Sequence, residues 1–412
     1  MRNRLIIILA AALATAACAK VSTDNIGGSE EEAPIRFQAV NYLSQTKADT
    51  HNHLEFTGES FKVQAFFHDT AFDAAVKKQK TFKYIDDTVV KDADGIWSPK
   101  KGPYYWPKTG MLSFFAVYPI INLSYGTEGP TISHYTVEPL YSKQSDATSD
   151  LMFATNKDQT CNDESDEHFA DGVALVFKHL LTKVMFEGKL LTTKNCVDGK
   201  IRVGDVYFTA VIDDIAISGI KNKGGFEFSS DNWILDSGQD LVSSGTIVDM
   251  NYSKANGDDF ELEKALPATE EFLTFRKGNV PTGDIIGYYV MPQWFGADNT
   301  DAKITVKYTV YALKKTSAEG AEEETFKVIS RTSYGSEEDT DHPAFEMALK
   351  DFYGKKSTES SSYPMNTWKG NTIYNYRFII DPFEGEIYFD PCMADWDRVD
   401  ADPVTIHLDV DN

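Results

Sequence analysis

Two histidines and a carboxylate near the amino end have a spacing that could bind a metal ion. His51, His53 and Glu55 alternate in the segment HNHLE, and alternate residues of a β-strand lie on one face. A zinc site needs a further convergent ligand, and the sequence does not identify one. A solvated pair of loop histidines is the favoured interpretation, so we predict no metal site.

Acidic residues between positions 163 and 167 offer the hard oxygen ligands that calcium prefers. Their spacing differs from that of an EF-hand loop, so a solvated run of charge is favoured. His179 lies in the apolar segment GVALVFKHLL. We expect a hydrogen-bonded structural histidine there, in preference to a metal ligand or a catalytic base.

The sequence lacks the familiar catalytic motifs. It contains no G-x-S-x-G elbow, no Walker lysine loop, no H-E-x-x-H and no C-x-x-C. Carboxylates are plentiful, but no sequence context singles out the two that a glycosidase would need. We therefore predict no catalytic residue, no cofactor and no enzymatic activity.

Composition and length limit the possible partners, the number of domains and the number of disulfides. A net charge of −23 would repel a nucleic-acid backbone or an anionic membrane face. A chain of 412 residues usually forms more than one domain. Besides Cys18, the cysteines are Cys161, Cys196 and Cys392. They leave room for one disulfide, such as Cys161 with Cys196, and exclude a disulfide scaffold.

The amino terminus has the features of a lipoprotein signal. Two arginines and an apolar run over residues 5–14 precede small residues and then Cys18. The run is too short to span a bilayer, which needs about 20 apolar residues. We predict a signal peptide over 1–17 and lipidation of Cys18, with an ordinary secretory signal as the alternative because Thr15 replaces the usual aliphatic residue. The polar segment 18–33 is predicted to be a flexible tether.

Alternation of apolar and polar residues dominates the rest of the chain and predicts β-strands with one buried face. Long amphipathic helical patterns are few, and residues 336–354 are a candidate for one short helix. Short strands separated by turns favour packed antiparallel sheets. An acidic segment at 156–171 is the best candidate for a boundary, which gives domains 34–165 and 166–412. The clearest alternating sets are Ile35, Phe37 and Ala39; Phe61, Val63 and Ala65; and Ile304, Val306, Tyr308 and Val310.

Four aromatic residues form a second candidate site. Trp97, Tyr104, Tyr105 and Trp106 could stack on sugar rings as a ligand platform, or they could be core and turn aromatics around WSP and YYWP. The residue types alone leave both interpretations open.

The carboxyl end also alternates cleanly. Segment 403–412 places Val404, Ile406, Leu408 and Val410 on one face. Such a segment is either the last strand of its own domain or a strand that another chain receives by β-strand addition. The sequence leaves both interpretations open.

Six segments in order resemble the fimbrillin family of Bacteroidales, including its Mfa-like members, and together they cover nearly the whole mature chain. The segments are YYWPKTGMLSFFAVYP from Tyr104, DLMFATN from Asp150, GVALVFKHLLTKVMFEG from Gly172, IGYYVMPQ from Ile286, WKGNTIYNYRFII from Trp368 and IYFDPCMADWD from Ile387.

The resemblance implies two tandem transthyretin-like antiparallel β-sandwiches, export as a lipoprotein to the outer membrane and cell surface, and assembly with other pilus subunits by strand exchange. It implies that the first strand, with Ile35, Phe37 and Ala39, is displaced after proteolysis and that a strand from another subunit fills the groove it leaves. The family usually carries Thr-Arg-Ala at the cleavage point, whereas this chain has Lys47 between Thr46 and Ala48. That departure leaves open whether Lys47 is cleaved and whether the subunit lies in the stalk, at the anchor or at the tip.

Adhesion to host or bacterial surface receptors is implied as well. Because the family carries the aromatics of WSP and YYWP as structural features, the resemblance favours the core and turn interpretation of the candidate ligand platform. The alternative function is a stand-alone surface lipoprotein, or tip adhesin, that binds a glycan or a host ligand.

Overall fold

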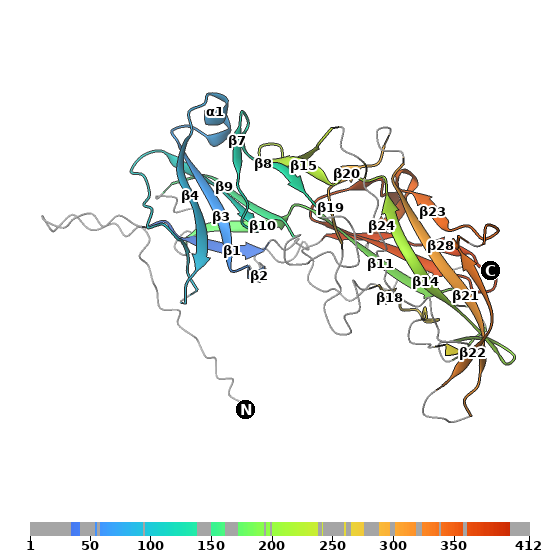
Figure 1. Cartoon of the computed structure of the whole chain (residues 1–412). Helices are drawn as coiled ribbons and strands as arrows, with labels where there is room; N and C mark the ends of the chain where they lie inside the picture. The colour runs from blue at the N-terminus through green and yellow to red at the C-terminus, as the bar shows by residue number, and fades with distance from the viewer. Residues whose placement is uncertain are drawn as a thin grey trace, which may run out of the picture. The chain divides into compact units, whose positions relative to one another are not determined.

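The all-β class predicted from the sequence is confirmed by a computed structural model (Figure 1). Within the described residues, helix is limited to α1 (Phe72–Lys77) and the single 3-10 turn η3 (Leu349–Asp351). The structure describes residues 34–41, 54–55, 58–93, 95–137, 150–160, 172–192, 195–197, 200–237, 241, 259–260, 265–275, 288–296, 301–318, 324–337, 339–356 and 361–395.

The chain divides into two compact units. Unit 1 comprises Met1–Tyr42, His51–Pro130 and Phe153–Lys178, and unit 2 comprises Leu43–Thr50, Thr131–Met152 and His179–Asn412. The chain therefore passes from one unit to the other more than once. The boundary predicted after residue 165 falls outside the described residues and stays a prediction.

Unit 1 is built on one eight-stranded sheet with the order β10-β9-β6-β3-β4-β5-β1-β2. Because β1 also pairs with β10, seven of these strands form a closed circuit. The strands are β1 (Phe37–Asn41), β2 (Leu54–Glu55), β3 (Ser60–His68), β4 (Phe82–Lys91), β5 (Trp97–Pro99), β6 (Met111–Tyr118), β9 (Met152–Gln159) and β10 (Val173–His179).

The unit 1 core follows the predicted alternation. The first set, Ile35, Phe37 and Ala39, is only 1%, 2% and 4% exposed, and the second set, which begins at Phe61, is fully buried. Burial of one face of each strand removes apolar area from water and supplies the main driving force for the sheet. In these two strands, the alternation in the sequence correctly predicts which side chains face the core.

Helix α1 was not predicted, because six residues are too few to show a helical period. Its stability comes from tertiary contacts. Phe72 packs on Phe115 with ring centroids 5.0 Å apart. The Phe72 backbone N–H, unpaired within a first helical turn, donates to the Asp158 carboxylate at 2.8 Å.

Unit 2 holds two larger sheets. One has the order β18-β11-β27-β29-β24-β25, with β19 and β28 beside it, and the other has the order β12-β13-β14-β21-β22-β17, with β23 beside it. Strand β15 pairs with β8 and β16, and β20 pairs with β26.

The bounds of the other strands are β7 (Ser124–Gly126), β8 (Gly129–Thr136), β11 (Thr182–Leu190), β12 (Cys196–Val197), β13 (Lys200–Val203), β14 (Val206–Ser218), β15 (Lys223–Glu227), β16 (Asn232–Leu235), β17 (Asp259–Phe260), β18 (Leu273–Thr274), β19 (Tyr288–Val290), β20 (Gln293–Trp294), β21 (Lys303–Lys315), β22 (Phe326–Tyr334), β23 (Phe345–Ala348), β24 (Tyr353–Lys356), β25 (Ser362–Pro364), β26 (Thr367–Trp368), β27 (Thr372–Ile380), β28 (Ile387–Phe389) and β29 (Cys392–Asp395).

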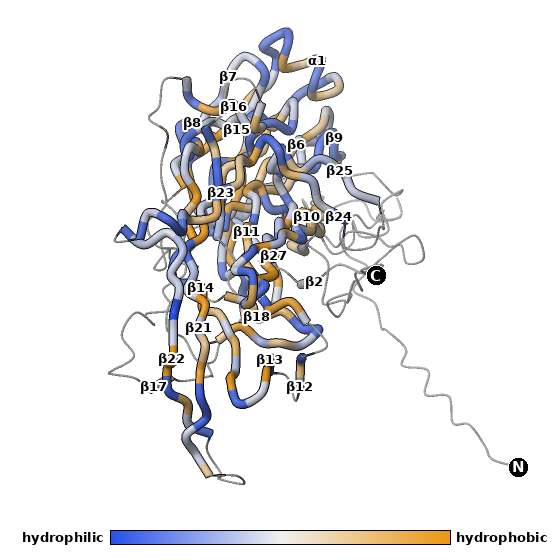
Figure 2. The backbone as a smooth tube through the Cα atoms, turned by 90° about the vertical axis from the view of Figure 1, so that its right-hand side faces the viewer, coloured by the Kyte–Doolittle hydropathy of each residue, from blue (hydrophilic) through white to orange (hydrophobic). Residues whose placement is uncertain are grey.

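Strand β21 contributes to two cores. Ile304, Val306 and Tyr308 join the main cluster, which draws side chains from both larger sheets and so lies between them. Beyond the middle of the strand, Tyr311 and Leu313 on the opposite face join a second cluster. The predicted solvent-facing side of β21 is therefore limited to the first half of the strand. Figure 2 shows hydrophobic positions interspersed with hydrophilic ones along β14 and β21.

The helix predicted within residues 336–354 is wrong. Residues Phe345–Ala348 form β23, which pairs antiparallel with β21, and only the single turn η3 separates it from β24. Phe352 is 1% exposed and packs edge-on against Tyr376 at 5.0 Å. Pairing with an existing strand and burial in the core outweigh the weak helical spacing of the apolar residues.

Within the described residues, no helix is both long and apolar enough to cross a bilayer. Cys196 and Cys392 are free thiols, and the Cys196 thiol donates to the Ala268 carbonyl at 3.0 Å. Cys161 lies outside the described residues.

Candidate functional site

Strand β1 completes the unit 1 sheet and is the centre of the candidate site. It runs parallel to β10, from the pair Phe37–Val173 to the pair Asn41–Phe177. On its other side it pairs antiparallel with β5 and β2. Removing β1 would leave the facing edges of β10 and β5 unpaired, with a groove between them.

The groove under β1 is aromatic. The Phe37 ring contacts Phe114 and Phe61 edge-on, with centroids 5.6 Å and 6.3 Å away. Phe61 in turn contacts Trp97 at 5.3 Å and Phe177 at 5.2 Å. These rings come from β3, β5, β6 and β10, so β1 buries its side chains against the rest of the unit.

Two backbone hydrogen bonds fix the start of β1. Ile35 donates its N–H to the Tyr104 carbonyl at 2.7 Å, and Val173 donates its N–H to the Arg36 carbonyl at 2.9 Å. Gly172 allows the backbone of Arg36 to lie this close to the start of β10. Its φ is +117°, and a Cβ there would lie 2.8 Å from the carbonyl carbon and oxygen of Arg36. Only glycine fits this conformation and this space.

The four residues of the candidate ligand platform do not share one exposed face. Trp97 is 4% exposed and lies in the core beside Phe61. Trp106 is half-buried and packs edge-on against Phe114, with ring centroids 5.9 Å apart. Tyr105 is 36% exposed, and Tyr104 is half-buried. Burial, with smaller contributions from two nearby aspartates, raises the pKa of Tyr104.

A family model described as Fimbrillin-like matches residues 46–396. The chain belongs to this family. The matched range contains every described strand of the fimbrillin-like chain except β1. Among curated proteins, none matches the sequence.

Three solved structures are similar to this fimbrillin-like chain. A fimbrial protein from Bacteroides vulgatus superposes with a TM-score of 0.55 at 17% identity, over 88% of this chain and 99% of that one. A candidate cell adhesion protein from Bacteroides ovatus gives a TM-score of 0.45 at 13% identity, over 89% and 98% of the two chains. Another from Bacteroides uniformis gives 0.40 at 15% identity, over 88% and 99%. The first of these likenesses shows a shared fold.

Several predicted site residues of the fimbrillin-like chain lie outside the described residues. They are the lipidation candidate Cys18, the processing candidate Lys47, the donor-strand residues Val404, Ile406, Leu408 and Val410, the histidines His51 and His53, and the acidic run at 163–167. Their roles stay predictions. Among the residues that are described, no cluster of three His, Cys, Asp or Glu side chains could hold a metal ion.

His179 makes the hydrogen bonds predicted for a structural histidine. Its Nδ1 lies 2.8 Å from a carboxylate oxygen of Asp150, and its backbone N–H donates to the Asn371 side chain at 3.3 Å. Both contacts fix the end of β10, so the residue positions the chain where the strand ends.

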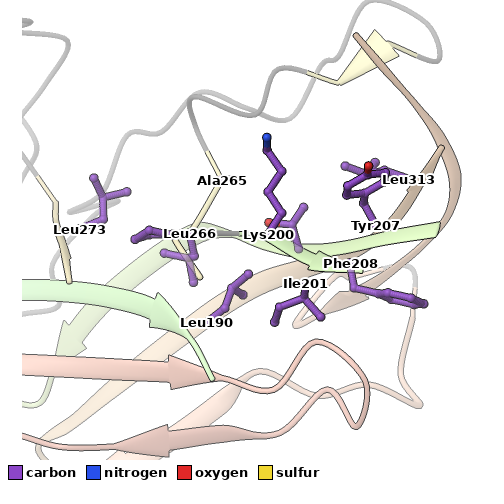
Figure 3. A pocket seen from close by; sticks show the side chains of 11 residues that line it. Leu190, Lys200, Ile201, Tyr207, Phe208, Ala265, Leu266, Leu273 and Leu313 are labelled. Atoms are coloured by element: carbon purple, nitrogen blue, oxygen red, sulfur yellow. The ribbon is translucent and has the colours of Figure 1, made fainter. Parts of the chain in front are cut away.

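A cavity of about 300 Å³ lies in unit 2 of the fimbrillin-like chain (Figure 3). Its walls are mostly apolar, and the Lys200 ammonium points away from Ile201 and Leu190 and forms an ion pair with Glu324. The cavity lies where the two core clusters meet, because Ile201 belongs to one and Leu313 to the other. We interpret it as a seam between packed clusters, since sugar recognition needs more hydrogen-bonding groups than this lining offers. The lining residues are Leu190, Lys200, Ile201, Tyr207, Phe208, Thr209, Ala265, Leu266, Pro267, Leu273 and Leu313.

Two residues at the β1 site were not predicted from the sequence. Gly172 stands directly before an apolar strand, and an isolated glycine at a strand end can signal a close backbone approach. Asp87 lies between Ile85 and Val89 in an alternating strand, at a position where an apolar residue is expected. A carboxylate that breaks the alternation was the available signal for the second residue.

Proposed function

We propose that this fimbrillin-like chain is a structural subunit of a cell-surface pilus that assembles by strand exchange and supports adhesion. The observation that carries the proposal is that β1 closes the sheet between β10 and β5 and buries its side chains against aromatic rings, so that its removal would leave an aromatic groove with a sheet edge on each side. Such a groove suits β-strand addition, in which main-chain hydrogen bonds supply affinity and side-chain pockets supply specificity. We propose that β1 is removed by cleavage at Lys47 and replaced by a strand from another subunit.

The energetics favour a tightly held replacement. Ile35 and Phe37 are almost fully buried, and each side chain of this size contributes roughly 1.5 to 3 kcal/mol on burial. A vacated groove would therefore expose substantial apolar area together with two unpaired strand edges. Unpaired edges readily recruit another strand. A subunit without β1 is accordingly reactive toward any strand of suitable pattern.

Segment 403–412 is our candidate for the donated strand, because Val404, Ile406, Leu408 and Val410 repeat the alternation of β1. We further propose that the two units are transthyretin-like sandwiches in tandem. The division into two units and the shared fold with a fimbrial protein support this arrangement.

Export as a lipoprotein through Cys18 would place the subunit at the outer membrane and cell surface before assembly. The amino-terminal pattern supports this step. Partners would be other pilus subunits and surface receptors. A structural role without catalysis accounts for the family match.

Amino-terminal sequencing of the surface protein, with mass analysis for acyl chains, tests this proposal. A start at Ala48 is expected if Lys47 is cut and β1 is lost. A lipidated start at Cys18 in protein recovered from assembled fibres would contradict removal of β1. It would favour an anchor or a stand-alone lipoprotein.

Deletion of residues 404–412 tests the donor strand separately. We expect a folded, exported monomer that does not enter fibres. Normal fibres built from the truncated protein would rule out this segment as the donor.

A glycan-binding lipoprotein is the second candidate function, and one observation favours it. Phe82, Tyr84 and Tyr105 are 67%, 38% and 36% exposed in unit 1, and the Tyr84 hydroxyl donates to the Tyr105 carbonyl at 2.7 Å. Exposed aromatic faces can stack on sugar rings. Binding of a panel of glycans to the wild type, and its loss in Tyr84→Ala, would support this function. No binding across the panel would remove it.

A further inference from the structure

A loop holds the start of β1 from the side opposite β10. We call residues 100–106, which follow β5, the clamp loop. The Tyr104 carbonyl accepts the Ile35 N–H at 2.7 Å, and Tyr105 forms an isolated antiparallel bridge with Pro34. The Trp106 ring packs on Phe114, the same ring that Phe37 contacts. The clamp loop therefore touches β1 through its backbone and through a shared core ring.

Asp87 of β4 anchors the clamp loop. Its carboxylate accepts the Lys101 backbone N–H at 2.7 Å through one oxygen and the Thr88 backbone N–H at 2.7 Å through the other. A second bond beside it, from the Lys100 N–H to the Thr88 carbonyl at 2.8 Å, joins the same loop to the same strand. The loop is thus fixed to β4 at the end opposite Tyr104.

The burial of Asp87 indicates that the anchor is specific. The residue is 1% exposed and lies opposite Val63 in the strand register. A carboxylate withdrawn from water is unfavourable unless hydrogen bonds compensate it. Two backbone N–H groups provide that compensation here, and one of them belongs to the clamp loop. An apolar residue at this position would fill the core but would leave the Lys101 N–H without this partner.

We propose that the clamp loop controls the release of β1 from its groove and that Asp87 is the positioning residue that keeps the loop closed. This inference rests on the proposed replacement of β1. When the loop is closed, β1 is held on both sides, by β10 and by Tyr104. When the loop opens, the start of β1 loses its bond to Tyr104 and is held by the bond to Val173 and by the pairing of Phe37 with Trp97 of β5. Opening of the loop therefore precedes departure of the strand.

The neighbouring residue provides a matched control. Asp86 lies next to Asp87 but contacts Lys62 and Lys83, at the half-exposed surface of the sheet. Asp86→Asn removes the same charge from the same strand without touching the clamp loop. Asp87→Asn keeps the size of the side chain but places an amide donor where one of the two N–H groups now binds.

Hydrogen exchange of the intact chain, followed by mass spectrometry, tests the proposal. In Asp87→Asn we expect the peptide covering residues 34–41 to exchange roughly 10- to 100-fold faster, the range that corresponds to losing one hydrogen bond to a charged group. Peptides from β3 and β6 should keep their rates. Asp86→Asn should not accelerate residues 34–41 selectively over β3 and β6, because its partner Lys62 lies on β3 and not in the clamp loop.

Two results would contradict the proposed role of the clamp loop and Asp87. An unchanged rate for residues 34–41 in Asp87→Asn would show that Asp87 does not hold β1. Equal acceleration of β1, β3 and β6 would assign Asp87 a general role in folding. Fibre formation by the wild type is measured in parallel and bears only on the proposed function, so the two failures are distinguishable.

Discussion

Replacing Gly172 with alanine should loosen β1 more than any other single methyl group added at the site. The residue has a φ of +117°, a region that non-glycine residues occupy at a cost of about 1–3 kcal/mol. The added Cβ would also lie 2.8 Å from two atoms of Arg36, a backbone clash that a flexible side chain cannot relieve. Forcing a methyl group into a filled space typically costs a further 1–3 kcal/mol or so.

A second glycine separates these two effects. Gly204, in the turn between β13 and β14, has a φ of +64°, and a Cβ there would have no neighbour within 4 Å. Gly204→Ala therefore carries only the backbone strain of the left-handed region, about 1–2 kcal/mol. The loss of stability in Gly172→Ala should exceed that in Gly204→Ala by at least about 1 kcal/mol, the lower end of the overpacking range.

Urea unfolding of both variants and the wild type, followed by tryptophan fluorescence, measures this difference. Trp97 lies in the unit 1 core beside Phe61 and reports on the sheet that β1 completes. We expect a lower midpoint for the unit 1 transition in Gly172→Ala alone. If the two alanine variants lose the same stability, the close approach of β1 to Gly172 does not constrain the sheet and the reasoning is refuted.

Three further predictions concern the same chain. Phe37→Ala should destabilise unit 1 by about 3–5 kcal/mol, whereas Gln38→Ala on the other face should change it by less than about 0.5 kcal/mol, as judged by urea midpoints. Burial acts to raise the pKa of Asp86, but bonds and charges from its two lysine partners outweigh it and lower the pKa to about 2. A depressed carboxyl pKa stabilises the folded state above the unfolded value near 4, so this contribution should fade as the pH falls from about 4 to about 2. Thermal melts of Asp86→Asn should lack that part of the acid dependence, and an identical profile would contradict it. Burial raises the pKa of Cys392 to about 11, so iodoacetamide at pH 8 should label this thiol only after unfolding, and labelling of the native protein would show that β29 opens.

The strand pattern was readable because alternation is a local property of the chain. Ile35, Phe37 and Ala39 face the core as their spacing predicts, since a strand buries every second residue. Helix α1 is not predictable from its own residues, because its stability depends on Phe115 and Asp158, which lie far from it in sequence. The same reason explains why residues 336–354 were misassigned, because β21 supplies the pairing partner that turns part of this segment into strand.

The contacts that hold β1 were beyond sequence reasoning. Alternation predicts that Phe37 is buried, but it does not predict that the partners are Val173 in register and the Tyr104 carbonyl. Asp87 appears in the sequence as an irregular polar residue, and its role depends on where the loop after β5 returns. The site is therefore defined by tertiary contacts between segments whose local patterns are ordinary.

The parallel pairing of β1 with β10 has a consequence for folding order. Phe37 is among the first residues of the unit to be synthesised, and its partner Val173 belongs to the last strand. Contacts between segments so distant in sequence form late, because a long loop must close first. We therefore expect the pairing of β1 with β10 to form after the pairings of β1 with the nearer strands β2 and β5. A chain in which β1 has not yet docked would present the edges of β10 and β5, and the pairing of β1 covers both of them.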